Sequence, residues 1–166
     1  MLAVTHRPET VEALPPPVPL TLAPPSPIEQ VLGFAFSTHG AQVLLIRKNR
    51  PEWQAGKLNG IGGKIEPGEM PDEAMAREFR EETGLETSKH NWQQFLTYSA
   101  GSHGTLIHCF TTRDLSIGRA RSLTDEVVSL HMVGELEGPA VPSLSWLLPM
   151  AHFALFHERL IGMVSS

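Results

Sequence analysis

The stretch "GGKIEPGEMPDEAMAREFREETGL", from Gly62 to Leu85, determines more of the predicted fold and chemistry than any other part of this chain. Its second half predicts a helix over residues 71–83. Pro71 suits a first helical position, because the N–H group that proline lacks would have no partner there. Glu73 favours the positive end of the helix dipole and can bond back to the backbone at the helix start. Gly84 can adopt the left-handed conformation that ends a helix.

Three glutamates of this helix converge on one face. Residues three and four positions apart lie on the same side of a helix, so Glu78, Glu81 and Glu82 must share a small volume, while Met75 and Phe79 form a neighbouring apolar stripe for the core. Like charges at this spacing destabilise a helix by about 0.2 to 0.5 kcal/mol per pair. A divalent cation would remove the conflict.

An alternative interpretation is a solvated acidic face balanced by Arg77 and Arg80, and the three glutamates alone do not exclude it. The residues before the helix favour a metal site. Gly62 and Gly63 lack a Cβ, so their backbone can approach a metal or a phosphate closely, and Lys64 adds a positive charge. Carboxylates suit Mg²⁺ or Mn²⁺, and Mg²⁺ commonly binds protein carboxylates together with substrate phosphates. The implied substrate is a polyphosphate.

Composition restricts the class of protein. A chain of 166 residues is the size of one ordinary domain. The net charge of −5 disfavours a nucleic-acid partner, and the single cysteine, Cys109, permits neither a disulfide framework nor a cysteine-ligated zinc site within one chain. No apolar segment is long enough to cross a bilayer, and the N-terminus lacks the pattern of a secretory signal. We therefore expect a soluble, cytoplasmic protein without a membrane or nucleic-acid partner.

The chain divides into a tail and a domain. Residues 1–27 include "ALPPPVPLTLAPPSP" and predict a flexible, Pro-rich tail, either a spacer or a proline-motif ligand. Residues 28–166 predict a mixed α/β domain, with helices covering a sheet, because hairpin-like strand pairs alternate with two helices. The expected elements are strands at 30–38, 41–48, 92–101, 105–112 and 126–133, a loop over 50–63, the helix at 71–83, and an apolar helix from residues 143–146 to 162.

The quoted stretch resembles the signature of the Nudix hydrolases without a break. The matching residues are Gly63, five others, Glu69, seven others, and then Arg77-Glu78-Phe79-Arg80-Glu81-Glu82-Thr83-Gly84-Leu85. The resemblance implies the Nudix fold, a mixed sheet flanked by helices, from about Gln30 to the last helix. It also implies hydrolysis of a nucleoside diphosphate linked to another group, by water and with Mg²⁺.

The same resemblance implies a role for each signature residue. The metal ligands would be Glu78, Glu82 and the carbonyl of Gly62, and Glu81 would bind a further metal or activate water. The residues with a positioning or structural role would be Arg77, which orients the glutamates, Glu69 and Gly84. Downstream, "TDEVVSLHMV" at 124–133 resembles the MutT-like subfamily that hydrolyses oxidised-purine nucleoside triphosphates, and nominates Glu126, and less strongly Asp125, as another metal-site acid. A turn or cap acid is the alternative for both.

Other residues are candidates for contact with the substrate. The stretch "GKLNGIGGK" at 56–64 resembles the same subfamily and nominates Asn59 as a reader of the base edge, with Gly63 and Lys64 also contacting the substrate. An amide group can both donate and accept. Where that subfamily carries an acidic pair before the last helix, this chain has Pro142 and Ser143, which argues against preference for an oxidised purine. Candidates for stacking on a base are Trp53 and Phe34, with loop or core packing as the alternative.

The leading functional hypothesis is a Mg²⁺-dependent pyrophosphohydrolase that converts a nucleoside triphosphate into the monophosphate and pyrophosphate. Its expected partner is a small nucleotide, an oxidised purine included, and a homodimer is compatible with the sequence. The alternatives are hydrolysis of ADP-ribose, a dinucleoside polyphosphate or a nucleotide sugar, and a non-catalytic nucleotide sensor. The presence of every signature acid favours catalysis over sensing.

Overall fold

The computed structural model describes residues 27–101, 104–113 and 116–157. The Pro-rich tail predicted for residues 1–27 lies outside this part of the chain except for its last residue, and so does the end of the last predicted helix. The strands are β1 (Glu29–Phe36), β2 (Gln42–Arg47), β3 (Leu58–Asn59), β4 (Gln93–Ala100), β5 (Thr105–Arg113) and β6 (Val127–Met132). The helices are α1 (Pro71–Thr83) and α2 (Leu144–Phe156), with 3-10 turns η1 (Glu52–Gln54), η2 (Lys89–Asn91) and η3 (Ile117–Arg119).

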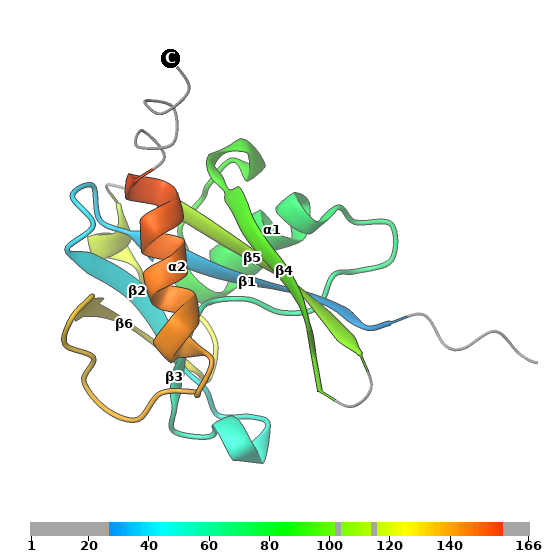
Figure 1. Cartoon of the computed structure of the whole chain (residues 1–166), viewed down its shortest axis with the longest axis horizontal. Helices are drawn as coiled ribbons and strands as arrows, with labels where there is room; N and C mark the ends of the chain where they lie inside the picture. The colour runs from blue at the N-terminus through cyan, green and yellow to red at the C-terminus, as the bar shows by residue number, and fades with distance from the viewer. Residues whose placement is uncertain (1–26, 102–103, 114–115, 158–166) are drawn as a thin grey trace, which may run out of the picture.

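The strands form one mixed sheet in the order β3-β2-β1-β5-β4, with β6 on the other edge of β2 (Figure 1). The central strand β1 runs parallel to β5 along its whole length, and the other pairs are antiparallel. The opposite edge of β1 has two partners. Its end pairs with β2, and its beginning pairs through isolated bridges with residues 61–64. The glycine segment before α1 is therefore part of the sheet.

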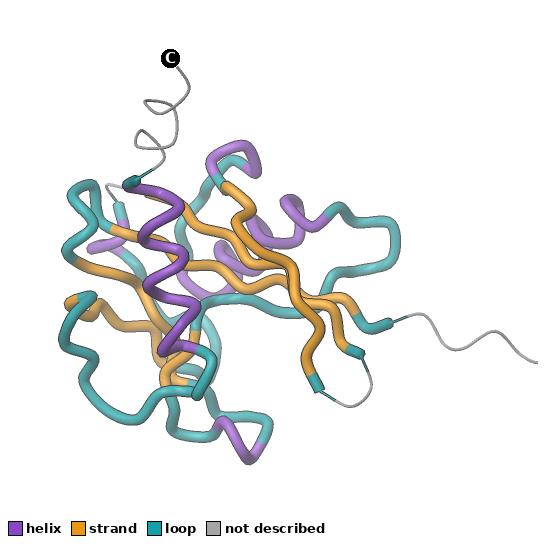
Figure 2. Tube along the Cα trace, in the orientation of Figure 1, coloured by secondary structure: helices purple, strands orange, loops and turns teal. Residues whose placement is uncertain are grey.

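Two helices cover opposite faces of this sheet, α2 in front and α1 behind in the view of Figures 1 and 2. Side chains of β1 alternate between the faces, as a strand buried on both sides requires. Val31 and Ala35 pack in the cluster under α1, whereas Phe34 and Phe36 pack in the cluster under α2. The mixed sheet flanked by helices confirms the predicted fold class.

Helix α1 begins and ends where the sequence predicts. Gly84 has the left-handed φ of 70°, and its N–H donates to the carbonyl of Arg80. At the other end Glu73 accepts a hydrogen bond from the backbone N–H of Met70 at 3.2 Å. Phe79 is fully buried and meets the ring of Trp92 edge-on, with ring centroids 5.1 Å apart. This packing places the apolar stripe of Met75 and Phe79 against the core, and the neighbouring face of α1 carries the glutamates.

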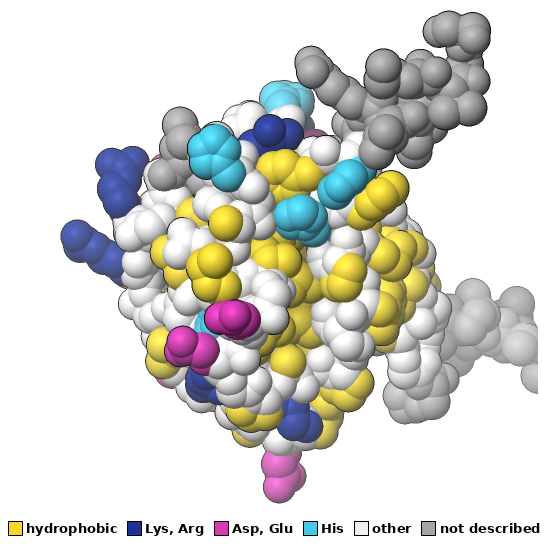
Figure 3. Space-filling view, turned by 60° about the vertical axis from the view of Figure 1, so that its left-hand side comes forward, with side chains coloured by type: hydrophobic (Ala, Val, Ile, Leu, Met, Phe, Trp, Pro, Cys, Tyr) yellow, Lys and Arg dark blue, Asp and Glu magenta, His cyan; other side chains and the backbone are white. Residues whose placement is uncertain are grey.

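Helix α2 is apolar on two sides. Its inner side packs on the sheet, as predicted, and the buried residues are Leu144, Leu147, Leu148 and Ala151. Its outer side exposes Trp146, Met150 and Phe153, and Figure 3 shows apolar side chains reaching the surface between separated charged groups. No helix among the described residues is long and apolar enough to cross a membrane.

The loop predicted over residues 50–63 has more structure than its composition indicates. It contains the turn η1 and the strand β3, which pairs with the end of β2. A two-residue strand is too short to show the alternation by which strands are recognised in a sequence. Its pairing depends on β2 and on Val141, whose N–H donates to the carbonyl of Leu58 at 3.0 Å.

We expect Gly62→Ala to lower the free energy of unfolding by about 1 to 3 kcal/mol, because a Cβ at this position would lie 2.0 Å from the carbonyl oxygen of Val31. Gly134→Ala is the matched control, since a Cβ there would meet no atom within 4 Å. Urea unfolding followed by circular dichroism measures both variants. Equal midpoints for the two variants would show that the segment at Gly62 can move away from β1.

Candidate functional site

The candidate site lies where α1, the glycine segment and the end of β2 meet. A Cβ built on Gly63 would lie 2.4 Å from Glu78 Oε1, so only glycine leaves room for this carboxylate against the backbone. The side chain of Glu78 is 15% exposed, and burial raises its pKa. The structure therefore brings Glu78 and Gly63, two of the predicted site residues, into direct contact.

Glu82 is the most buried acid of α1. Its Oε2 accepts a hydrogen bond from the backbone N–H of Gly62 at 3.3 Å. Burial raises the pKa of Glu82 to about 7, and the charges of Glu78 and Glu126 add to the rise while Lys48 opposes it. Glu82 thus lies among other carboxylates with too little positive charge around it to keep it fully ionised at neutral pH.

Glu126 reaches this cluster from the loop before β6. It accepts hydrogen bonds from Lys48 Nζ at 2.5 Å and from the backbone N–H of Asn49 at 2.8 Å. Asp125, the weaker candidate, points elsewhere, because its carboxylate is 62% exposed and lies 3.6 Å from Arg50. Lys48 is not among the residues predicted for the site, because its only local signal is a cation at the end of a strand.

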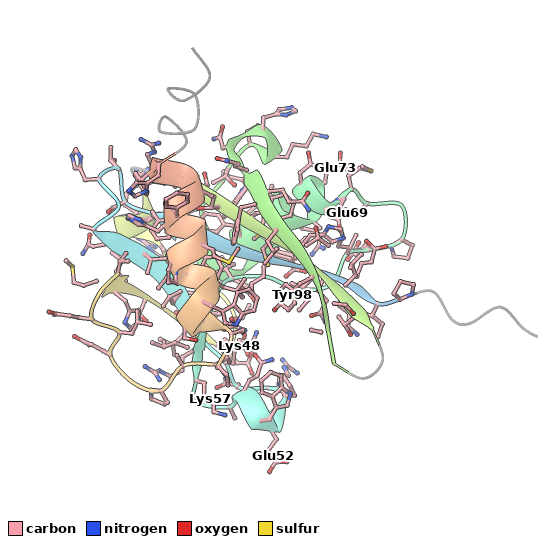
Figure 4. All side chains as sticks on the ribbon, viewed as in Figure 1. Lys48, Glu52, Lys57, Glu69, Glu73 and Tyr98 are labelled. Carbon is pink, nitrogen blue, oxygen red and sulfur yellow. The ribbon has the colours of Figure 1, made fainter. Side chains whose placement is uncertain are left out.

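Arg77 connects α1 to the loop that precedes it. Its Nε and Nη2 each donate to one carboxylate oxygen of Glu69 at 2.8 Å, and Nη2 also donates to the carbonyl of Lys64 at 3.0 Å. Nη1 donates to Glu78 Oε1 at 2.8 Å. These bonds hold the pKa of Glu69, labelled in Figure 4, below its ordinary value. A two-pronged pair of this kind needs the planar guanidinium group, which lysine lacks.

Glu81 differs from its two neighbours. Its carboxylate is 50% exposed, and its nearest cation is Arg77, with Nη1 3.5 Å from Oε2. The three glutamates that were predicted to converge therefore differ in burial. Glu78 and Glu82 face inward toward the glycine segment, whereas Glu81 has access to water.

The donor set suits a hard divalent cation, because its members are carboxylate and carbonyl oxygens. Burial is the main cause of the raised pKa of Glu82, the charges of Glu78 and Glu126 add to it, and a cation bound beside them would favour the ionised form. In the part of the chain that the structure describes, no three acidic, histidine or cysteine side chains are close enough to hold an ion as they stand. Arg77 and Lys48 occupy oxygens of Glu78 and Glu126 instead.

A cavity of about 750 Å³ opens beside these residues, large enough for a nucleotide. It lies between η1, the β4–β5 hairpin and the start of α2, and Figure 4 shows Lys48 and Tyr98 in this region. The charged side chains that line it are Lys48, Arg50 and Lys64, and no carboxylate among the described residues does so. The cavity is therefore cationic, beside an acidic cluster.

Of the other residues predicted to contact the substrate, some line the cavity and one does not. Asn59 and Gly63 line the cavity, and so do Pro142 and Ser143 at the position where an acidic pair was considered. Trp53 also lines it, with 61% of its surface exposed. Phe34 is fully buried in the core under α2, so the hypothesis that it stacks on a base is wrong. A phenylalanine in the middle of a doubly covered strand belongs to the core.

Comparison with known proteins gives a consistent result. A family model of the NUDIX domain matches residues 28–146. Among solved structures, the NUDIX domain of Shewanella oneidensis NrtR complexed with ADP ribose is 19% identical, with a TM-score of 0.66, over 81% of this chain and 89% of that one. The MutT NUDIX hydrolase from Burkholderia pseudomallei is 19% identical, with a TM-score of 0.61, over 74% and 97%.

A third similar structure is the ORF135 protein of E. coli, which is 26% identical, with a TM-score of 0.59, over 80% of this chain and 92% of that one. The likeness to the first two structures shows the fold, and the family match covers most of the chain, including the unbroken signature from Gly63 to Leu85. On this basis the chain belongs to the Nudix family of hydrolases.

Proposed function

We propose that this Nudix protein is a Mg²⁺-dependent pyrophosphohydrolase that cleaves a nucleoside triphosphate to the monophosphate and pyrophosphate. Membership of the family implies hydrolysis of a phosphoanhydride bond, and its hydrolases generally use divalent metals. One observation carries the finer proposal. The buried acids Glu78 and Glu82 lie against the glycine segment at the side of a cavity whose charged lining is entirely cationic. Such a cavity favours a ligand with several negative charges.

In this proposal Glu78, Glu82 and the carbonyl of Gly62 would hold the metal, and Glu81 and Glu126 would be further ligands. Mn²⁺ would satisfy the same oxygen donors. When bound, the metal would polarise phosphoryl oxygens and offset charge on the leaving phosphate.

Protein groups would perform the remaining steps. Lys64 would bind substrate phosphates, and Arg77 would keep Glu78 oriented through their 2.8 Å hydrogen bond. Glu81 is our candidate to accept the proton of the attacking water, because its carboxylate is the exposed member of the three.

A second candidate function is hydrolysis of ADP-ribose or another nucleoside diphosphate derivative. The similar NUDIX domain of NrtR was solved with ADP ribose, which supports a nucleotide ligand for this cavity as well. The cationic lining does not by itself separate the two substrate classes, because both carry adjacent phosphates. A substrate panel does separate them.

We expect Glu78→Gln and Glu82→Gln each to lower kcat/KM for the best nucleoside triphosphate by at least about 100-fold in the presence of Mg²⁺, because each removes a charged metal ligand. Release of pyrophosphate measures hydrolysis of a panel of triphosphates, oxidised ones included. Chromatographic separation of the nucleotide products measures hydrolysis of ADP-ribose, dinucleoside polyphosphates and nucleotide sugars, none of which releases pyrophosphate. Glu86→Gln, an exposed acid just after α1, is the control and should keep full activity. Faster turnover of ADP-ribose than of every triphosphate would favour the second candidate.

The raised pKa of Glu82 predicts how stability depends on pH without metal. This carboxyl group holds its proton more tightly in the folded than in the unfolded chain, so its contribution is fully present below pH 4.5 and is lost as the pH rises through about 7. Glu82→Gln, which cannot ionise, should therefore be more stable than the wild type at pH 8 by about 3 kcal/mol and equally stable near pH 4.

Urea unfolding in a chelating buffer at the two pH values measures this difference. Adding Mg²⁺ at pH 8 should stabilise the wild type and should stabilise Glu82→Gln much less, since bound ligand favours the folded state. If Glu82→Gln is less stable than the wild type at pH 8 without metal, the ionised carboxylate of Glu82 does not destabilise the fold, which would contradict the prediction.

A further inference from the structure

Two side-chain amides form a relay on one wall of the cavity. The backbone N–H of Gly60 donates to Asn59 Oδ1 at 2.8 Å, and Asn59 Nδ2 donates to Gln54 Oε1 at 3.2 Å. A backbone N–H can only donate, so the Asn59 atom that faces it must be the oxygen. The Gln54 atom that faces Asn59 Nδ2 must then also be the oxygen. One backbone group therefore sets the orientation of both amides.

The relay leaves this wall rich in hydrogen-bond donors. Gln54 and Asn59 both line the cavity, and no hydrogen-bond partner of Gln54 Nε2 is present among the described residues. The two N–H bonds of this nitrogen are available to a ligand, whereas the oxygens of both amides each already accept one hydrogen bond and keep one lone pair. Asn59 keeps one N–H bond and one lone pair, so its predicted role as a reader of the base edge stays a prediction.

The other residues that line the cavity add further hydrogen-bond donors. Lys48, Arg50 and Lys64 can only donate, and no carboxylate from the described part of the chain lines the cavity. Tyr98 and Ser143 contribute hydroxyl groups, which can donate or accept and so do not discriminate. A carbonyl oxygen of a base that faces Gln54 Nε2 therefore finds a hydrogen-bond donor, whereas an amino group in the same place meets another donor.

We propose that Gln54 is a specificity-determining residue that selects bases with a carbonyl oxygen at the edge facing η1, so that 6-oxo purines are preferred to the 6-amino purine adenine. This inference rests on the proposed function, because it names the base of the substrate taken by the same site. A donor facing a donor leaves both unpaired, and discrimination of about 10- to 100-fold in kcat/KM is expected from such a mismatch.

Inosine and adenosine triphosphates provide the test. Inosine has an oxo group where adenosine has an amino group at purine position 6, and its N1 is a donor where that of adenosine is an acceptor, while the ribose and phosphates are the same. We expect kcat/KM with Mg²⁺ to be at least about 10-fold higher for inosine triphosphate. Gln54→Glu replaces the free amide nitrogen by an acceptor oxygen and should shift the ratio toward adenosine triphosphate by at least about 10-fold. Gln54→Leu, which removes both groups, should bring the ratio close to one.

Asn59→Asp tests the relay itself. An aspartate at this position can still accept from Gly60 but cannot donate to Gln54, so the Gln54 amide should turn and present its oxygen to the ligand. The ratio should again shift toward adenosine triphosphate. Glu52→Gln is the control, because Glu52 belongs to the same turn η1, does not line the cavity and projects away from the body of the protein in Figure 4. It should leave the ratio unchanged.

Equal kcat/KM for the two triphosphates in the wild type, or an unchanged ratio in both Gln54→Glu and Asn59→Asp, would overturn the inference and leave the proposed function standing. If no triphosphate is hydrolysed, the proposed function fails instead. Calorimetric binding of inosine and adenosine monophosphates without metal then decides the inference separately. Tighter binding of the inosine nucleotide supports it, and equal or reversed affinities refute it. Circular dichroism confirms that each variant is folded.

Discussion

The backbone pairing between β1 and residues 61–64 is the constraint on which the site depends. Gly33 donates to the carbonyl of Ile61 at 2.7 Å and accepts from its N–H at 3.0 Å, and Val31 donates to the carbonyl of Gly63 at 2.9 Å. Residue 62 then lies so close to β1 that a side chain cannot be accommodated. The same pairing points the N–H of Gly62 at Glu82 and leaves Gly63 against Glu78. Sheet geometry thus determines where the buried acids can lie.

The acidic cluster is stabilised from two directions by long cationic side chains. Arg77 holds Glu69 and Glu78 from within α1, and Lys48 holds Glu126 from the end of β2. Glu82 accepts a hydrogen bond from the N–H of Gly62, and burial together with the neighbouring carboxylates Glu78 and Glu126 raises its pKa although Lys48 opposes the rise. Removing a carboxylate from water without full compensation costs stability, and proteins commonly accept this cost at functional sites.

The acids and the cavity lie on different sides of the sheet. Helix α1 covers one face and carries the acids, while the cavity opens on the other side, near the start of α2 and the turn η1. The glycine segment passes between them at the edge of β1, so it borders both the carboxylates and the cavity. In the proposed function this arrangement would separate phosphate chemistry from recognition of the base. The amide relay at Asn59 and Gln54 belongs to the second task.

The sequence by itself determined α1, with its start at Pro71 and its end at Gly84, because helix caps and periodicity are local properties. It also determined the order of the two helices and of the five longer strands along the chain, and the spacing that defines the family signature. Only the tertiary structure decided which carboxylates meet, since Lys48, Gly62 and Glu126 approach α1 from distant segments through sheet pairing. The tertiary structure also shows that Glu126 lies in the acidic cluster whereas Asp125 is exposed, that Phe34 is a core residue, and that residues 58–59 form the short strand β3. Those outcomes depend on contacts between residues far apart in the chain, which local patterns do not record.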